Sequence, residues 1–131
     1  MIFVDAGAWV ASFYTADQHH IAAVKWLRQN QEPLTTTDYI IDEALTVLKA
    51  RGEPRRAFEL GDAFFGGRLA HIHYLAEDEI LAAWQVFRTY SDNEWSFTDC
   101  TSKVVIEKLG VTQALAFDQH FRQFGTVAVV P

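Results

Sequence analysis

The sequence alternates between short β-type runs and longer segments with helical spacing, and this alternation constrains the fold more than any other feature. The β-type runs are "MIFVD" at 1–5, "PLTTT" at 33–37, "LAHIHYL" at 69–75, "ALAFD" at 114–118 and "TVAVV" at 126–130. At least one helical segment separates each run from the next. Because strands joined through helices usually run parallel, the pattern predicts an α/β fold with a mainly parallel sheet.

The helical segments have recognisable start and stop residues. Asp17 is suited to cap a helix over about 17–31, and Asp38 to cap a helix that Gly52 ends. Pro54 fits the first turn of the next helix. Further helices are predicted over 54–67, 77–90, 99–109 and, as a short helix or turn, 119–125.

Composition and charge narrow the class of protein. With 131 residues, of which 50% are hydrophobic, the chain suits one domain over 1–131. No apolar run approaches the roughly 20 residues of a bilayer-spanning helix, and the N-terminus lacks the basic start of a secretory signal. The single cysteine, Cys100, excludes an internal disulfide and favours the cytoplasm. A net charge of −6 has the wrong sign for a nucleic-acid binder, unless metal or local cations offset it.

Three aspartates follow β-type segments. Asp5 ends the first run and Asp118 ends "ALAFD". Asp99 follows "WSFT" at 95–98, whose alternation indicates a short strand, and it opens the helix over 99–109. In an open parallel sheet, ligands bind outside the carboxyl ends of the strands. We therefore expect the three carboxylates at one edge of the sheet.

Glu43 is a fourth candidate, and it lies inside a predicted helix. Ile40 and Val47 share its face at helical spacing, so Glu43 is expected at the edge of the buried stripe. Lys49 and Arg51 are not spaced to neutralise it.

Four carboxylates that meet away from bulk water would repel one another. At about 4 Å and an effective dielectric constant of 20, each pair costs roughly 4 kcal/mol. Several such pairs exceed the stability of a small domain, about 5–15 kcal/mol. Protonation, a buried cation or a divalent metal must compensate, and hard carboxylate oxygens suit Mg²⁺ or Mn²⁺. Thr98 is placed to cap the helix that starts at Asp99, or to hold that carboxylate.

These acids lie in stretches that resemble the PIN-domain nucleases, especially the VapC-type toxins of toxin–antitoxin pairs. The stretches are "FVDAGAWVASFY", "TTTDYIIDEALTVLKARG", "YSDNEWSFTDCTSKVVIEKLG" and "ALAFDQHFRQFG". The resemblance implies a three-layer α/β/α sandwich with an acidic pocket that holds Mg²⁺ or Mn²⁺ and cleaves RNA. It also implies a small antitoxin partner and a homodimer. It places the metal-binding and catalytic acids of the family on Asp5, Glu43, Asp99 and Asp118, and a supporting hydroxyl on Thr98.

A basic segment follows the helix of the second acid. "KARGEPRR" contains four cations that are candidates to contact RNA phosphates: Lys49, Arg51, Arg55 and Arg56. Lys103 is a further candidate. The alternative is a solvated helix end whose cations complement the helix dipole.

Other conspicuous residues receive structural interpretations. His120 in "FDQHF" could reach a phosphate, but it is expected rather to pack or to cap a turn, and Glu94 to be a loop acid. Five aromatic residues are expected in core or interface positions rather than as platforms for base stacking: Trp26, Trp84, Phe64, Phe65 and Phe87.

Three alternatives stay open. A non-catalytic module of the same fold would bind an antitoxin or a ribonucleoprotein, and metal-dependent turnover of RNA separates it from a nuclease. A receiver-like phosphoryl-transfer domain also gathers Asp at strand ends. It would have paired acids after its first strand and a Lys on its last, whereas Asp5 stands alone and "TVAVVP" has no Lys. The residues do not separate DNA from RNA as the substrate.

Overall fold

The computed structural model describes residues 1–131 and contains one sheet of short parallel strands. The strands are β1 (Ile2–Val4), β2 (Leu34–Thr37), β3 (His71–His73), β4 (Gln113–Leu115) and β5 (Ala128–Val130). Their order is β3-β2-β1-β4-β5, and every neighbouring pair is parallel. The predicted α/β fold with a parallel sheet is confirmed.

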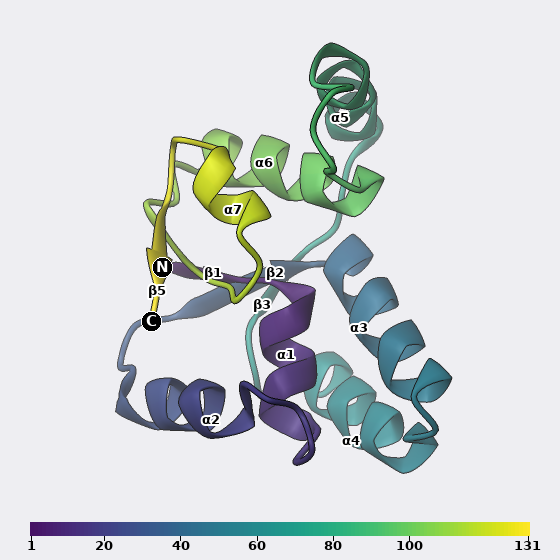
Figure 1. The fold of residues 1–131 in the computed structure, drawn as a ribbon, viewed down its shortest axis with the longest axis vertical. Coiled ribbons are helices and arrows are strands. Elements are labelled where there is room, and N and C mark those ends of the chain that lie inside the picture. Colours follow the sequence, from purple (N-terminus) through teal and green to yellow (C-terminus); the bar gives the residue numbers. More distant parts are fainter.

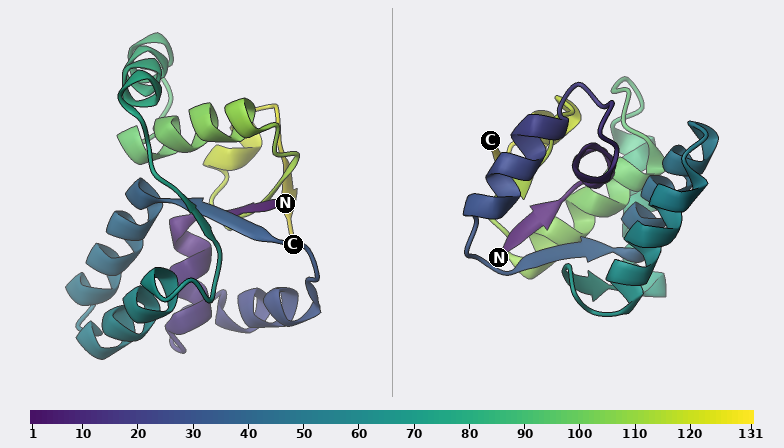
Figure 2. Two further views of the ribbon diagram at one scale, coloured as in Figure 1. Left: turned by 180° about the vertical axis from the view of Figure 1, so that it is seen from behind. Right: turned by 90° about the horizontal axis from the view of Figure 1, so that it is seen from below.

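Helices cover both faces of the sheet. One face carries α1 (Ala6–Phe13), α2 (His20–Gln29), α3 (Asp38–Ala50) and α4 (Pro54–Phe65) (Figure 1). The other carries α5 (Glu77–Thr89), α6 (Phe97–Leu109) and α7 (His120–Gln123), as Figure 2 shows from behind. The three-layer sandwich is therefore also confirmed. None of the helices is both long and apolar enough to cross a bilayer.

The core surrounds β1, whose residues Ile2–Val4 are all buried. Trp9 of α1 packs edge-on against Phe64 of α4, with the ring centroids 4.9 Å apart. The threonine-rich strand β2 can be buried because its hydroxyl groups have partners. Thr36 Oγ1 donates to the carbonyl of Val4 at 3.3 Å and accepts from Trp9 Nε1 at 3.3 Å. These bonds fix the end of β1 and the start of α1.

Two predicted helix starts differ from the structure, the start of α2 by about three residues and the cap of α3 by one. The helix α2 begins after Asp17, because Asp17 Oδ1 accepts a hydrogen bond from the N–H of His19 at 2.8 Å and turns the chain before the helix. The cap of α3 is Thr37 rather than Asp38, since Thr37 Oγ1 accepts from the N–H of Ile40 at 3.1 Å.

The segment 95–98 is not a strand, because a capping box starts α6 inside it. Ser96 Oγ accepts from the N–H of Asp99 at 3.0 Å, and Asp99 Oδ2 accepts from the N–H of Ser96 at 3.0 Å. These reciprocal bonds satisfy two backbone donors of the first turn. Ser96 is thus the cap that was expected at Thr98, which lies within the first turn.

Candidate active site

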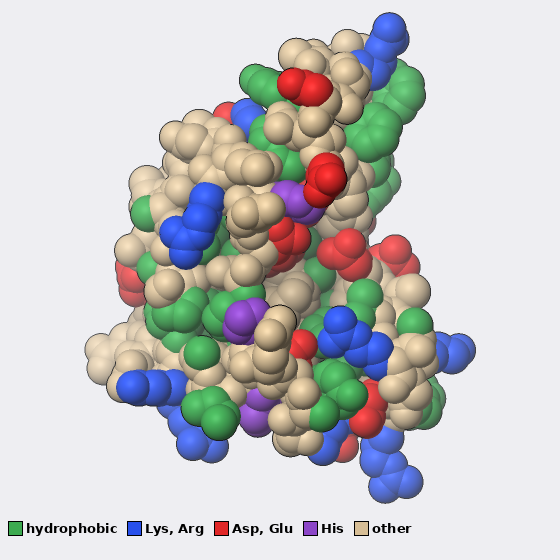
Figure 3. All heavy atoms as spheres, in the orientation of Figure 1, with side chains coloured by type: hydrophobic (Ala, Val, Ile, Leu, Met, Phe, Trp, Pro, Cys, Tyr) green, Lys and Arg blue, Asp and Glu red, His purple; other side chains and the backbone are tan.

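The carboxyl ends of β1 and β4 lie where the chain leaves the sheet toward opposite sides. From β1 the chain continues to β2, whereas β4 pairs with the other edge of β1 and continues to β5. A crevice forms at such a switch point. The structure has a cavity of ≈ 300 Å³ there. Figure 3 shows this face hollowed between the two layers of helices, with acidic and histidine side chains around the hollow.

The four predicted acids line this one cavity, and each comes from a different element. Asp5 follows β1 and Asp118 follows β4, while Glu43 lies on α3 and Asp99 in the first turn of α6. The structure therefore brings the four side chains together from distant parts of the sequence.

Asp5 is the most deeply placed of the four. It is 5% exposed, and its side chain makes no capping bond although it precedes α1. Burial raises the pKa of its carboxyl to about 8, and repulsion from Asp99 adds to the shift. Glu43 and Asp118 contribute further repulsion, whereas a hydrogen bond from the N–H of Ala6 opposes the shift. A neighbouring cation would reverse this effect and favour the ionised carboxylate.

Glu43 has a similar environment. Burial raises the pKa of its carboxyl, and repulsion from Asp99, Asp118 and the adjacent Asp42 raises it further. The side chain is half-buried, as its predicted position at the edge of the apolar stripe requires.

Asp99 and Asp118 are held by His120. The ring Nδ1 of His120 lies 3.0 Å from Asp99 Oδ2 and 3.3 Å from Asp118 Oδ1. The N–H of His120 also donates to Asp118 Oδ1 at 2.8 Å. His120, expected to pack or cap a turn, is therefore a residue of the cavity. The signal available in the sequence was its place just after the acid in "FDQHF".

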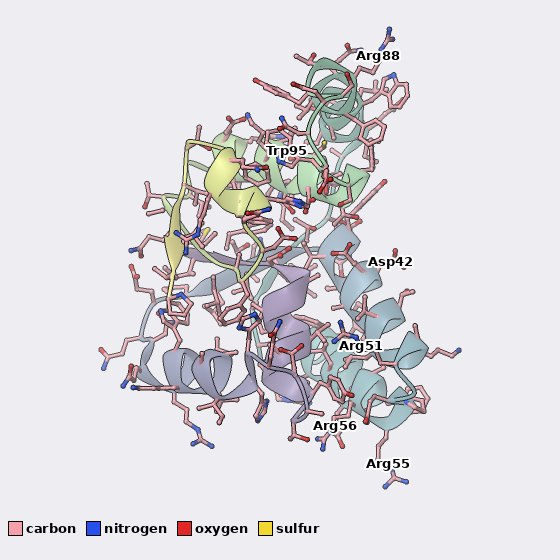
Figure 4. All side chains as sticks on the ribbon, viewed as in Figure 1. Asp42, Arg51, Arg55, Arg56, Arg88 and Trp95 are labelled. Atoms are coloured by element: carbon pink, nitrogen blue, oxygen red, sulfur yellow. The ribbon has the colours of Figure 1, made fainter.

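Arg51 is the cation that lines the cavity, together with Asp17 and Glu94. Its Nη1 lies 3.4 Å from Asp17 Oδ2, and its guanidinium carbon lies 5.9 Å from the centroid of the Tyr14 ring. Arg51 thus pairs with Asp17 and with none of the four predicted acids. In Figure 4 its side chain points from the end of α3 toward the hollow.

The other cations of the predicted RNA-binding set do not line the cavity: Lys49, Arg55, Arg56 and Lys103. Figure 4 shows Arg55 pointing into solvent at the start of α4. Arg56 Nε lies 4.0 Å from Glu53 Oε2. Lys103 Nζ lies 2.7 Å from Glu107 Oε1 and 5.8 Å from the centroid of the Tyr90 ring. Of that set, the structure brings Arg51 alone to the acids.

The carboxylates that line the cavity are suitable ligands for a hard divalent cation, although their oxygens do not converge on a single position. In the present side-chain positions, no group of three His, Cys, Asp or Glu residues could hold a metal ion. Carboxylate oxygens are nevertheless the ligands that Mg²⁺ and Mn²⁺ prefer. The pKa values of Asp5 and Glu43 are raised first by burial and then by repulsion from the neighbouring carboxylates, which a cation would relieve. The side chains would have to rotate toward a common ion to bind it.

Comparison with known proteins gives one consistent family. The PIN domain model matches residues 2–127. Over 131 residues the chain is 30% identical to the 23S rRNA-specific endonuclease VapC20 of Mycobacterium tuberculosis, covering 100% of this chain and 99% of the relative. It is also 30% identical over 129 residues to the VapC ribonuclease of Archaeoglobus fulgidus, covering 90% of this chain and 77% of the relative.

Solved structures agree with the fold. The crystal structure of Mycobacterium tuberculosis VapC20, described as a sarcin-ricin-loop-cleaving toxin, superposes with a TM-score of 0.93 at 28% identity and covers 100% of both chains. FitAcB from Neisseria gonorrhoeae superposes with a TM-score of 0.67 at 17% identity, covering 100% of this chain and 97% of that one. At that identity, the second likeness concerns the fold alone.

Proposed function

Since the chain belongs to the PIN-domain family and is homologous to VapC endonucleases, we propose that it is a divalent-metal-dependent endoribonuclease. The observation that carries this proposal is the cavity in which four carboxylates meet around the buried Asp5. Asp5, Asp99 and Asp118 would hold the metal, and Glu43 would bind it directly or through water. When bound, Mg²⁺ or Mn²⁺ lowers the pKa of water and stabilises charge on the phosphoryl oxygens.

The residues of the chain itself have separate roles in this proposal. Ser96 and His120 both contact Asp99 Oδ2 and keep that carboxylate turned into the cavity. Glu43 is half-buried and its pKa is raised, so its carboxylate is suited to accept the proton of the attacking water. Arg51 is the candidate contact for a backbone phosphate beside the acids.

No side-chain nucleophile is required. Cys100 is the obvious candidate beside Asp99, but burial raises the pKa of its thiol to about 11, and repulsion from Asp99 adds to the shift. The thiol therefore stays protonated at neutral pH and is a poor nucleophile. Hydrolysis by an activated water fits the site better than a covalent intermediate.

The biological setting is proposed from the family. We infer that this chain is the toxin of a VapBC-type pair, that its cognate antitoxin is a small protein, and that the toxin forms a homodimer in the cytoplasm. RNA is favoured over DNA as the substrate because the two curated relatives are named as an rRNA endonuclease and a ribonuclease.

The experiment that tests the proposal replaces one acid at a time. Asp5→Asn and Asp99→Asn should each lower RNA cleavage in Mg²⁺ or Mn²⁺ by at least about 100-fold, because each removes a charged ligand. Asp42→Asn is the matched control, since Asp42 is exposed on α3 next to Glu43 and does not line the cavity. In Figure 4 it lies on the outer side of that helix.

Unchanged cleavage in the two site variants would rule out this active site. RNA binding without turnover in the wild type would favour the non-catalytic module.

A further inference from the structure

A second cavity lies beside the acidic one, and its walls are aromatic. Its volume is ≈ 290 Å³, and its lining includes Phe87, Tyr90, Asn93, Glu94, Trp95 and Cys100. Glu94 lines both cavities, so the two cavities lie next to each other. The aromatic residues come from the end of α5 and the loop that leads into α6.

The walls combine one fixed ring with two accessible rings. Trp95 is 7% exposed, its Nε1 donates to Gln123 Oε1 at 2.8 Å, and its ring packs edge-on against Phe124. Tyr90 lies against Trp95 with the ring centroids 5.1 Å apart. Phe87 is 40% exposed and Tyr90 is 41% exposed. Phe87 therefore presents ring surface to solvent instead of being covered within the core of this chain.

The polar groups around these rings suit a flat ligand with hydrogen-bonding edges. The amide of Asn93 can both donate and accept. Lys103 Nζ lies 5.8 Å from the centroid of the Tyr90 ring and 2.7 Å from Glu107 Oε1, so an ion-paired lysine stands next to the aromatic wall. A nucleotide has a base whose π-face suits the rings and whose polar edges suit the amide, and it carries a backbone phosphate that a cation attracts. Neither an aliphatic side chain nor a free phosphate would use both features.

We propose that the aromatic cavity formed by Phe87, Tyr90 and Trp95 binds a nucleobase of the RNA, next to the bond that is cleaved. The proposal rests on the ribonuclease function proposed above and names the part of the substrate that this second cavity recognises. A nucleotide beside the acidic cavity would place its base against Tyr90 and its ribose hydroxyls, which can donate hydrogen bonds, near the carboxylate of Glu94. The base must be unpaired to enter, so the site favours single-stranded RNA or a loop.

The test measures RNA binding in an Asp5→Asn background, in which cleavage is expected to be slow enough for binding to be measured. The probes are a single-stranded RNA of about eight nucleotides with 2-aminopurine at its centre, and the same RNA with an abasic ribose there. Tyr90→Leu and Phe87→Leu should each weaken binding of the first RNA by roughly 10- to 100-fold, and should reduce the fluorescence quenching of 2-aminopurine. Neither substitution should change binding of the abasic RNA. Tyr90→Phe should retain both the affinity and the quenching, because it keeps the ring.

Phe58→Leu is the matched control for these variants. Phe58 is 67% exposed on α4, which lies at the opposite end of the molecule from α5 (Figure 1). It should bind both RNAs like the parent protein. Circular dichroism and the melting temperature show whether each variant is folded, and Phe87→Leu remains informative if Tyr90→Leu does not fold.

Several results would contradict a base-binding cavity. They can be distinguished from results that contradict the proposed ribonuclease function. Equal weakening on both RNAs, or none on either, would show that no base is bound there. A changed molecular mass by light scattering with unchanged RNA binding would assign the aromatic surface to a second copy of the chain. Loss of antitoxin binding alone would assign it to that protein. If the wild type cleaves RNA and Tyr90→Leu leaves RNA binding unchanged, this inference is wrong and the proposed ribonuclease function still holds. If the parent binds no RNA and the wild type cleaves none, the proposed function falls as well.

Discussion

His120 Nδ1 lies 3.0 Å from Asp99 Oδ2 and thereby joins α7 to the first turn of α6 across the acidic cavity. The same carboxylate oxygen accepts the N–H of Ser96 at 3.0 Å. Asp99 is thus restrained from two sides, even before any ion is bound. Groups that orient a ligand in this way affect a metal site nearly as strongly as the ligands themselves.

Removing the imidazole should therefore weaken metal binding without removing a carboxylate. We expect His120→Ala to lower Mn²⁺ affinity and RNA cleavage by about 10- to 100-fold, because Asp99 and Asp118 both lose a contact. Titration calorimetry with Mn²⁺ measures the first effect and a cleavage assay the second. His71→Ala is the control, since His71 is exposed on the edge strand β3. Wild-type Mn²⁺ affinity in His120→Ala would contradict the positioning role.

The raised pKa of Asp5 predicts how stability varies with pH when metal is chelated. The pKa is about 8 in the folded chain against 3.8 for the free side chain, so between these values the folded state retains a proton that the unfolded state has released. The free energy of unfolding therefore falls as the pH rises through this window. Asp5→Asn has no such proton to lose. It should match the wild type near pH 4 and exceed it increasingly toward pH 8, by up to about 5 kcal/mol. Urea unfolding at several pH values measures the difference, and a difference that does not vary with pH would refute the explanation.

A divalent cation should remove this instability. Ligand binding to the folded state alone stabilises it by about 2.7 kcal/mol when the ligand is present at 100 times its Kd. We therefore expect Mn²⁺ to raise the Tm of the wild type at pH 8, and to raise that of Asp5→Asn far less. Asp42→Asn should respond like the wild type, because Asp42 lies outside the cavity. Equal shifts in all three proteins would place the ion elsewhere.

The positions of Asp5 and Asp118 could be predicted because they depend on strand direction alone. Asp5 and Asp118 each follow an apolar run, and parallel pairing brings the carboxyl ends of β1 and β4 to the same edge. The position of Glu43 at the edge of the buried stripe follows from helical spacing. Ser96 and Asp99 have the spacing of a capping box, which indicates the start of α6, but the apolar alternation of Trp95 and Phe97 favours a strand over the same residues.

The partners of the acids depend on loop paths and rotamers, which spacing does not encode. His120 reaches Asp99 because the chain turns sharply after Asp118, where the N–H of His120 bonds to that aspartate. Arg51 lies at the cavity, where it pairs with Asp17 of the loop before α2. Such contacts between segments far apart in the sequence become visible only with the tertiary structure.

Arg51 and Arg55 offer the clearest test of how this acidic protein binds an anionic substrate. Both belong to the basic segment of the sequence, but Arg51 lines the cavity and Arg55 points into solvent (Figure 4). The carboxylate of Asp17 and the ring of Tyr14 hold the Arg51 side chain, so it can meet a phosphate without first being ordered. Each phosphate contact on a single strand makes the slope of log affinity against log salt about 0.7 more negative. Arg51→Gln should therefore weaken RNA binding and make the slope about 0.7 less negative, whereas Arg55→Gln should change neither quantity. Fluorescence anisotropy over a salt series measures both quantities. Equal losses in the two variants would mean that the basic segment acts as a diffuse patch, and that Arg51 has no special place in substrate binding.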